Sequence, residues 1–361
     1  MFLNSTISLG RNETSLNQNN CSYLLVDSTA ERMSKLFAYC FILLGSFFGN
    51  ISIIIIVYKH RDLRKTVNYF IVNMALSDLL FPLIVIPFEI TQLMTDSWHR
   101  HVSGNLGSIL CASYHFTHDF SLHVSIQSLV WIAVDRFLAV VFPMKLGLMS
   151  TKIRAIAITS TWIFAGVLNF PWLLTSKLVE RGNNTFCVVI YKAGPVFPNQ
   201  EAIAAHIWLH ATFVSIAPLF VITVLYSIIA ISLKRQIKVL KDTTASLQRH
   251  SLRKRKQAIQ MTVAIVVLFY ICVIPQTLVY FISHLGPSCD FLRPPIYFIA
   301  IFALCLSSVV NPTVCLTFVQ SYRQGLRNIL CSFVTKRNNK VTKCEQISLK
   351  RIRHFPDENC G

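Results

Sequence analysis

The composition of this 361-residue chain places it in a membrane. Hydrophobic residues make up 53% of the chain and charged residues 14%, whereas about a quarter of the residues in soluble domains are charged. The formal net charge of +18 is explained by basic residues held on the cytoplasmic side, next to anionic lipid, so nucleic-acid binding is not expected.

Seven apolar stretches are each long enough to cross a bilayer, which takes about 20 residues of helix. They lie at residues 36–58, 69–94, 108–134, 155–176, 202–233, 258–283 and 294–319. The sequence therefore predicts an all-α membrane protein with a seven-transmembrane helix bundle over residues 35–319. An odd number of spans places the two termini on opposite sides of the membrane.

The basic residues predict which side is which. Most of the 34 Lys and Arg residues fall in the first, third and fifth loops and in the C-terminal tail. Short loops rich in Lys and Arg stay in the cytoplasm, so residues 1–34 are expected to be an extracellular N-terminus. Glycosylation acceptors on the predicted outer side agree with this orientation; they are Asn4, Asn12, Asn20 and Asn183.

Ionisable side chains inside the spans are costly in a bilayer and usually have a function. Asp78 and Glu89 lie in the second span and Asp119 in the third, which is followed by Asp135-Arg136-Phe137. Other motifs accompany them in the remaining spans: Gly49-Asn50, Asn73-x-x-x-Ser77-Asp78, Trp162, Pro218, Cys272-x-x-Pro275 and Asn311-Pro312. In order and spacing the chain resembles a rhodopsin-like (class A) G-protein-coupled receptor of the neuropeptide-receptor type, over roughly residues 35–333.

The resemblance implies a plasma-membrane receptor that passes the binding of an extracellular ligand to a heterotrimeric G protein. No nucleotide loop or nucleophile–base pair argues for an enzyme. One alternative is a receptor of the same fold that takes a non-peptide ligand, or that is constitutive or a scavenger. Another is a seven-span transporter, which would show repeated halves and broken helices that this sequence lacks.

The resemblance also implies which residues carry the signal. Asp135 is expected to hold Arg136 at rest, and Arg136 to move towards Tyr226 on activation. Further residues implied in G-protein coupling and activation are Pro143, Met144, Pro275, Asn311 and Pro312. Two positions depart from the family pattern, because Val273 stands in place of a Trp and Cys315 in place of a Tyr. Both departures remove groups that couple the ligand to helix motion in the family.

Cysteines divide between the two sides of the membrane. The resemblance implies a disulfide between Cys111, at the outer end of the third span, and Cys187, in an outer loop able to form a hairpin. Such a bond persists in an oxidising environment. Cys21 and Cys289 are also extracellular; they pair with each other, or are free or separately paired.

Asp78 is the centre of an expected sodium site. The resemblance places Ser125, Ser307 and Ser308 in the same pocket, with Asn50 and Asn311 beside them. These side chains supply the oxygen ligands that a hard cation prefers. The alternative is a hydrogen-bonded polar core with no bound ion, and no other cofactor is expected.

Prolines inside the spans bend the helices and open a cavity on the outer side, where this family binds its ligand. The expected lining residues are Glu89, Gln92, His115, His118, Asp119, Leu122, His210, Gln276 and Tyr280. For any one His, a satisfied hydrogen bond in the bundle is the plainer interpretation. Two carboxylates among aromatic residues favour a short basic or amidated peptide. A retinal Schiff base is excluded because residues 294–319 contain no Lys.

The chain after the last span is predicted to form a short amphipathic helix over residues 320–334. Apolar residues recur there at helical spacing, at Tyr322, Leu326, Ile329, Leu330 and Phe333. Such a helix lies along the inner leaflet, in contact with membrane lipid. Cys331 is a candidate for palmitoylation, and the polar residues 335–361 are expected to be a disordered cytoplasmic tail.

Overall fold

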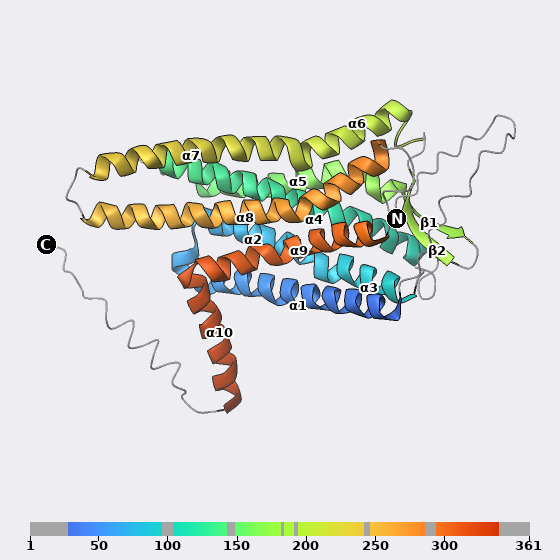
Figure 1. The fold of residues 1–361 in the computed structure, drawn as a ribbon, viewed down its shortest axis with the longest axis horizontal. Helices are drawn as coiled ribbons and strands as arrows, with labels where there is room; N and C mark the ends of the chain where they lie inside the picture. The colour runs from blue at the N-terminus through green and yellow to red at the C-terminus, as the bar shows by residue number, and fades with distance from the viewer. Residues whose placement is uncertain are drawn as a thin grey trace.

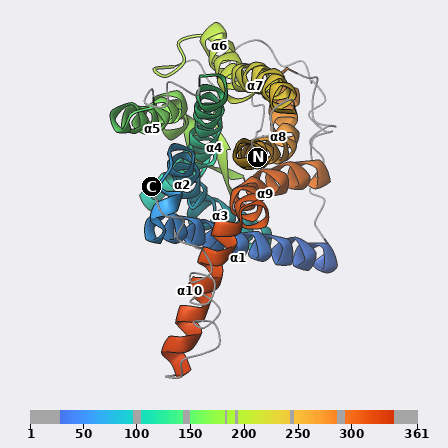
Figure 2. The same cartoon turned by 90° about the vertical axis from the view of Figure 1, so that its left-hand side faces the viewer.

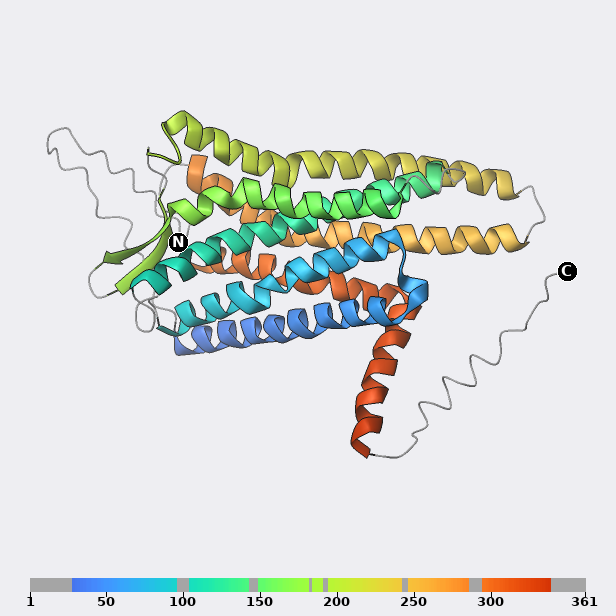
Figure 3. The same cartoon turned by 180° about the vertical axis from the view of Figure 1, so that it is seen from behind.

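The structure is a computed structural model, and it describes residues 28–95, 104–142, 149–181, 184–190, 194–241, 246–285 and 294–338. Seven helices in this part of the chain are long and apolar enough to cross a membrane. They run side by side as one bundle (Figures 1 and 3). The predicted all-α fold with seven spans is therefore confirmed.

The spans are built from the following elements, in chain order. They are α1 (Thr29–Lys59), α2 (Thr66–Asp78) with η3 (Phe81–Val85) and α3 (Ile86–Thr95), α4 (Gly104–Val141), α5 (Thr151–Thr175), α6 (Gln200–Ala211) with η6 (Thr212–Ile216) and α7 (Ala217–Lys241), α8 (Ser246–Leu285) and α9 (Pro294–Phe318). A short 3₁₀ turn, η2 (Arg61–Leu63), separates α1 from α2. Helix α4 is central, because it packs against α2, α5 and α7.

The first helix begins at Thr29, seven residues before the predicted start at residue 36. Ser28 and Glu31 form a capping box, in which the Ser28 hydroxyl accepts from the Glu31 backbone and the Glu31 carboxylate accepts from the Ser28 backbone. This pair satisfies backbone donors that the first turn would otherwise leave open. The helix therefore begins within the predicted extracellular segment 1–34, whose last six residues belong to α1.

Two spans contain a turn of π-helix. One covers Phe81–Val85 and includes Pro82, and the other covers Thr212–Ile216, just before Pro218. A proline cannot donate its backbone nitrogen, and its ring crowds the preceding turn. An extra residue in the turn relieves this crowding and rotates the side chains that follow. Three further prolines, Pro171, Pro275 and Pro312, lie inside α5, α8 and α9.

A hairpin covers one end of the bundle, which we call the hairpin end (Figure 1). Its strands β1 (Ser176–Arg181) and β2 (Asn184–Val189) pair antiparallel, with Leu178 opposite Cys187. Cys187 forms a disulfide with Cys111 near the start of α4. The predicted disulfide and hairpin are thus confirmed, and together they tie the chain after α5 to the central helix.

A last helix, α10 (Gln320–Asn338), leaves the opposite end of the bundle at a steep angle to α9 (Figures 1 and 2). Tyr322 on its first turn is buried in the core, and burial raises the pKa of its hydroxyl. The predicted short C-terminal helix is confirmed, but it continues to Asn338, beyond the expected end at residue 334. Residues 335–338 are therefore helical and not part of a disordered tail.

The outward surface of the bundle is apolar. Large side chains such as Phe37, Phe41 and Phe48 on α1, and Ile163 and Val167 on α5, are more than half exposed. Apolar surface of this extent is unfavourable in water, whereas hydrocarbon solvates it. The arrangement is that of a multi-pass membrane protein.

Candidate functional site

A small pocket lies near the hairpin end, one turn along α4 from Cys111. Four of its lining residues, Tyr114, His115, His118 and Asp119, come from α4. Residues four apart share one face of a helix, so Tyr114 lies next to His118 and His115 next to Asp119. The remaining lining residues are Trp172 from α5, Gln276 and Tyr280 from α8, and Tyr297 and Ile301 from α9.

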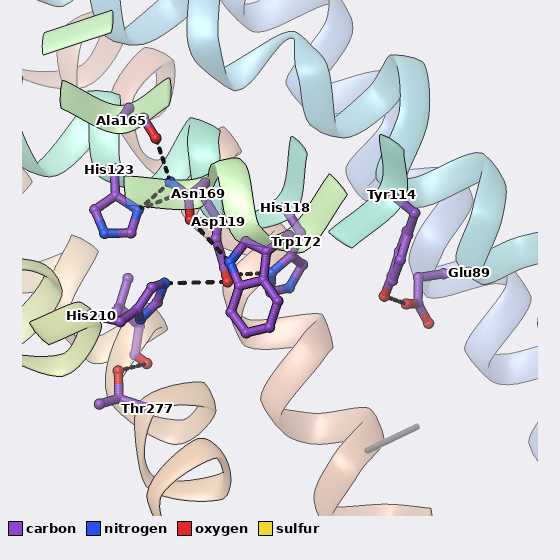
Figure 4. Close-up of polar contacts among 11 residues, drawn as sticks. Glu89, Tyr114, His118, Asp119, His123, Ala165, Asn169, Trp172, His210 and Thr277 are labelled. Carbon is purple, nitrogen blue, oxygen red and sulfur yellow. Dashed lines mark hydrogen bonds and ion pairs between the residues drawn. The ribbon is translucent and has the colours of Figure 1, made fainter. Parts of the chain in front are cut away.

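Asp119 is held between two imidazoles (Figure 4). Its Oδ1 lies 2.8 Å from Nδ1 of His118, and its Oδ2 lies 3.3 Å from Nε2 of His210 on α6. The Asp119 side chain is 16% exposed, so most of its carboxylate is removed from solvent. None of the pocket-lining residues is Lys or Arg.

A second row of hydrogen bonds orients the wall of the pocket. Nδ1 of His123 lies 2.7 Å from the backbone carbonyl of Asp119 and 3.0 Å from the side-chain amide nitrogen of Asn169. The Asn169 side chain donates to the carbonyl of Ala165 and accepts from the indole of Trp172 at 3.2 Å. The rings of His123 and His210 meet edge to face, with centroids 4.8 Å apart. These contacts fix the Trp172 and His210 rings around Asp119.

Glu89, the other buried carboxylate near this end, is not among the lining residues. It accepts one hydrogen bond from the phenol of Tyr114 and another, at 3.3 Å, from the phenol of Tyr39 on α1. Its side chain is almost fully buried. The two carboxylates therefore have different partners, which are phenols for Glu89 and imidazoles for Asp119.

Nine residues were predicted to line the ligand cavity, and five of them do line this pocket. They are His115, His118, Asp119, Gln276 and Tyr280. His210 lies behind Asp119, Leu122 is buried in the apolar core, and Glu89 and Gln92 lie outside the lining. Sequence reasoning missed Tyr114, Trp172, Tyr297 and Ile301. Of these, Tyr114 was readable, because it precedes His118 by four residues on the same helical face.

The centre of the bundle is a polar cluster around Asp78. Ser125 donates to Oδ1 of Asp78 at 3.0 Å, and Asn311 donates to Oδ2 at 2.7 Å. Ser77 lies 3.1 Å from Ser125, hydroxyl to hydroxyl. The amide of Asn50 donates to the backbone carbonyl of Ser308 at 2.9 Å. Three helices, α2, α4 and α9, thus meet at one carboxylate.

The donor set of this cluster fits a sodium ion in part. Oxygens of Asp78 and Ser125 are adjacent, and Oδ1 of Asn311 is buried without a hydrogen-bond partner among the described residues. The hydroxyls of Ser307 and Ser308 donate to carbonyls of their own helix, at 2.6 and 2.7 Å, and retain lone pairs. Carboxylate, hydroxyl and amide oxygens suit a hard cation. A sodium site and an ion-free polar core both stay open as predictions.

A second set of polar contacts surrounds Asn73 on α2. The amide nitrogen of Asn73 donates to Ser128 at 2.9 Å and to Thr161 at 3.1 Å. Its amide oxygen accepts from the indole of Trp162 at 2.7 Å. Asn73 therefore joins α2 to α4 and α5, which gives the Asn and the Trp a packing reason to occur together.

At the end opposite the hairpin, Arg136 pairs with its neighbour Asp135. Nη2 of Arg136 lies 3.0 Å from Oδ2 of Asp135, as the resemblance implied for a resting receptor. Tyr226 on α7 is half-buried against the core. Gln236 of α7 donates to the Val140 carbonyl of α4 at 2.9 Å, so the ends of these helices are joined. Helix α4 extends to Val141, so the pair lies inside the helix, just beyond the predicted span 108–134.

The two positions that depart from the family pattern are filled by packing. Val273 on α8 is 1% exposed and Cys315 on α9 is fully buried, and both belong to the main apolar core. Pro275 and Pro312 lie within the same two helices.

Some predicted sites lie outside the described residues. These are the sequons at Asn4, Asn12, Asn20 and Asn183, the cysteines Cys21 and Cys289, the loop residues Pro143 and Met144, and residues 339–361. Cys331 is described on α10, and its sulfur is in a disulfide. A sulfur in a disulfide cannot carry a thioester, so palmitoylation of Cys331 stays a prediction for the reduced thiol.

Comparison with known proteins gives matches over most of the chain. The model of the 7 transmembrane receptor (rhodopsin family) matches residues 49–314. The neuromedin-K receptor of Rattus norvegicus is 27% identical over 323 residues, which cover 88% of this chain and 67% of that receptor. The substance-K receptor of Canis lupus familiaris is 28% identical over 306 residues, 82% of this chain and 76% of that receptor. A QRFP-like peptide receptor of Branchiostoma floridae is 28% identical over 239 residues, 66% of this chain and 61% of that receptor.

Proposed function

The chain belongs to the rhodopsin family of seven-transmembrane receptors, and from that premise we propose that its extracellular ligand is a short peptide. As a member of this family it is a G-protein-coupled receptor and not an enzyme. The proposal adds that the protein lies in the plasma membrane, with the hairpin end outside the cell. The basic loops predicted to be cytoplasmic support this orientation.

Two lines of support favour a peptide. Relatives that cover most of this chain are a neuromedin-K receptor and a substance-K receptor, and a further relative is a QRFP-like peptide receptor. The observation that carries the proposal is the pocket beside the hairpin, where the Asp119 carboxylate faces aromatic side chains such as Trp172 and Tyr280. A pocket with largely aromatic walls and one carboxylate suits the side chain or terminus of a peptide.

Helix α8 connects the pocket to the other end of the bundle and so provides a route for the signal. Gln276 and Tyr280 line the pocket directly beyond Pro275 on α8. A ligand that displaces them moves the outer half of α8 about the proline, where a backbone hydrogen bond is missing. At the other end of α8, Gln257 donates to the Phe318 carbonyl of α9 at 3.1 Å. Movement of α8 breaks this bond and opens the face on which Arg136 lies, where the G protein binds.

Second-messenger output in cells tests the proposal. Cells express the wild type or Arg136→Ala at matched surface levels, and receive a library of short amidated peptides. A peptide-dependent signal in the wild type that Arg136→Ala abolishes is the expected result. Surface-expressed wild type that responds to no peptide contradicts the peptide proposal. That outcome favours a non-peptide ligand, or a constitutive or scavenger receptor of the same fold.

A further inference from the structure

Only one of the two buried carboxylates near the hairpin end faces the pocket. Glu89 accepts hydrogen bonds from the phenols of Tyr39 and Tyr114 and is not among the residues that line the pocket. Asp119 lines the pocket and is contacted by His118 and His210. Any cationic group that enters the pocket therefore meets Asp119 and not Glu89.

The charge of Asp119 needs a counter-charge. Apolar side chains and lipid surround this part of the bundle, and an uncompensated charge is expensive there. Lys and Arg are absent from the pocket lining. Other titratable groups facing the site are Tyr114, His115 and His123 on α4, His206 on α6, Tyr280 on α8 and Tyr297 on α9. Helix α5 contributes Trp172 and Asn169, which do not titrate in this range.

The two imidazoles that touch Asp119 are placed to supply that counter-charge. An imidazole gains or loses a proton between about pH 5 and 8. His118 and His210 approach different oxygens of the carboxylate, from α4 and from α6 (Figure 4). Nε2 of His118 is buried and has no hydrogen-bond partner among the described residues. One proton carried by either ring makes the group of Asp119, His118 and His210 neutral overall.

We propose that a cationic group of the ligand, an amine or a guanidinium, binds Asp119 in exchange for this proton, so that ligand binding releases one proton. The ligand nitrogen donates to the carboxylate, the imidazolium gives its proton to water at the pocket mouth, and a neutral imidazole is left. The net charge of the pocket is the same before and after. This inference rests on the proposed function, because it names the chemistry of the ligand at that site.

The proposed proton exchange predicts the direction in which ligand affinity changes with pH. Protons and the ligand cation compete for the same carboxylate, so acid weakens binding and alkali strengthens it. With one proton released per bound cation, the apparent dissociation constant rises about tenfold for each pH unit lowered, over the range in which the free site is protonated. At higher pH, where the free site has lost its proton, the dependence disappears.

The test uses the purified full-length receptor and two matched probes, n-butylguanidinium and the uncharged n-butylurea. A guanidinium stays charged at every pH used, so the probe itself does not titrate. The midpoint of thermal unfolding is measured against probe concentration from pH 5.5 to 8. The wild type is expected to be stabilised by n-butylguanidinium and not by n-butylurea, with a half-saturating concentration that rises as the pH falls.

Two variants with the same chemical change test which carboxylate binds n-butylguanidinium. Asp119→Asn is expected to abolish the stabilisation by n-butylguanidinium, whereas Glu89→Gln, the same chemical change at the other carboxylate, is expected to retain it. Equal effects of the two probes, a pH-independent guanidinium effect, or retention in Asp119→Asn with loss in Glu89→Gln would each overturn the proposal. If Asp119→Asn does not fold, the double variant His118→Gln, His210→Gln decides: we expect guanidinium binding with a flat pH profile, and an unchanged profile contradicts us.

This experiment needs no G protein, so its outcome is separable from that of the cellular assay. A receptor that binds n-butylguanidinium in this way but never signals to a peptide overturns only the proposed function. A receptor that signals to peptides but does not distinguish the two probes overturns only the proton exchange.

Discussion

The side-chain amide of Asn311 donates a hydrogen bond to Oδ2 of Asp78 across 2.7 Å and so joins α9 to α2 at the centre of the bundle. Ser125 of α4 donates to the other oxygen of the same carboxylate. A hydrogen bond to a charged group contributes about 1.5–3 kcal/mol, more than one between neutral groups. One side chain thereby couples three helices, and its charge state affects how all three pack.

Sodium dependence is the first expected consequence. If Na⁺ occupies the Asp78 cluster, replacing choline chloride by NaCl at equal ionic strength raises the unfolding midpoint of the wild type. The gain is about 1.4 kcal/mol when Na⁺ is at ten times its dissociation constant. Asp78→Asn is expected to lose this difference between the salts. Ser52→Ala serves as the control, because the Ser52 hydroxyl contacts only the Phe48 carbonyl of its own helix. Equal midpoints for the wild type in both salts would favour the ion-free polar core.

Basal signalling is expected to rise in Asp135→Asn. The contact between Asp135 and Arg136 is partly exposed, and its loss is expected to cost the resting state about 1 kcal/mol at most. A change of that size shifts the ratio of active to resting receptor about fivefold. The measurement is ligand-independent second-messenger output at matched surface expression. Asp62→Asn changes an exposed acid in the turn after α1 and is the control; unchanged output in Asp135→Asn would mean that other packing holds the resting state.

Docking of α10 is expected to fail in Gly325→Ala. A Cβ at Gly325 would lie 2.7 Å from Cγ2 of Ile56 and 3.3 Å from Nε2 of His60, so α1 and α10 would have to separate. Overpacking of this kind costs about 1–3 kcal/mol. Gly166→Ala is the matched control, because its nearest neighbour, Phe120, is 3.9 Å away. The midpoint of thermal unfolding should fall in Gly325→Ala and should not fall in Gly166→Ala. Similar midpoints in the two variants would show that α10 can shift without cost.

Loss of the hairpin disulfide is expected to reduce stability and ligand binding together. Cys187→Ser frees β2 from α4, and removal of a disulfide typically costs about 2–4 kcal/mol. The unfolding midpoint of the wild type should fall on addition of reductant, and that of Cys187→Ser should fall by less, because only the wild type has the Cys111–Cys187 bond to lose. Cys40→Ser, at an exposed free cysteine, is the control. A wild type that is insensitive to reductant would argue that the pocket does not depend on the hairpin anchor.

Much of the fold was predictable because its signals are local. The length of each apolar run determines whether a helix can span a bilayer, and the basic loops indicate its orientation. The early start of α1 was also a local signal, since Ser28 and Glu31 have the spacing of a capping box. The prediction missed it because it followed hydrophobicity alone. The extension of α4 past Arg136 was missed for the same reason.

The sequence by itself determined the seven spans and identified Glu89 and Asp119 as carboxylates in need of partners. Only the tertiary structure decided which partners they have. Glu89 takes its phenols from α1 and α4, and Asp119 takes one imidazole from α6, far along the chain. The pocket also needs Trp172 from α5 and Tyr297 from α9. The physical reason is that hydrophobicity acts along one helix, whereas a buried polar group is satisfied by whichever neighbouring helix the packing brings within about 3 Å.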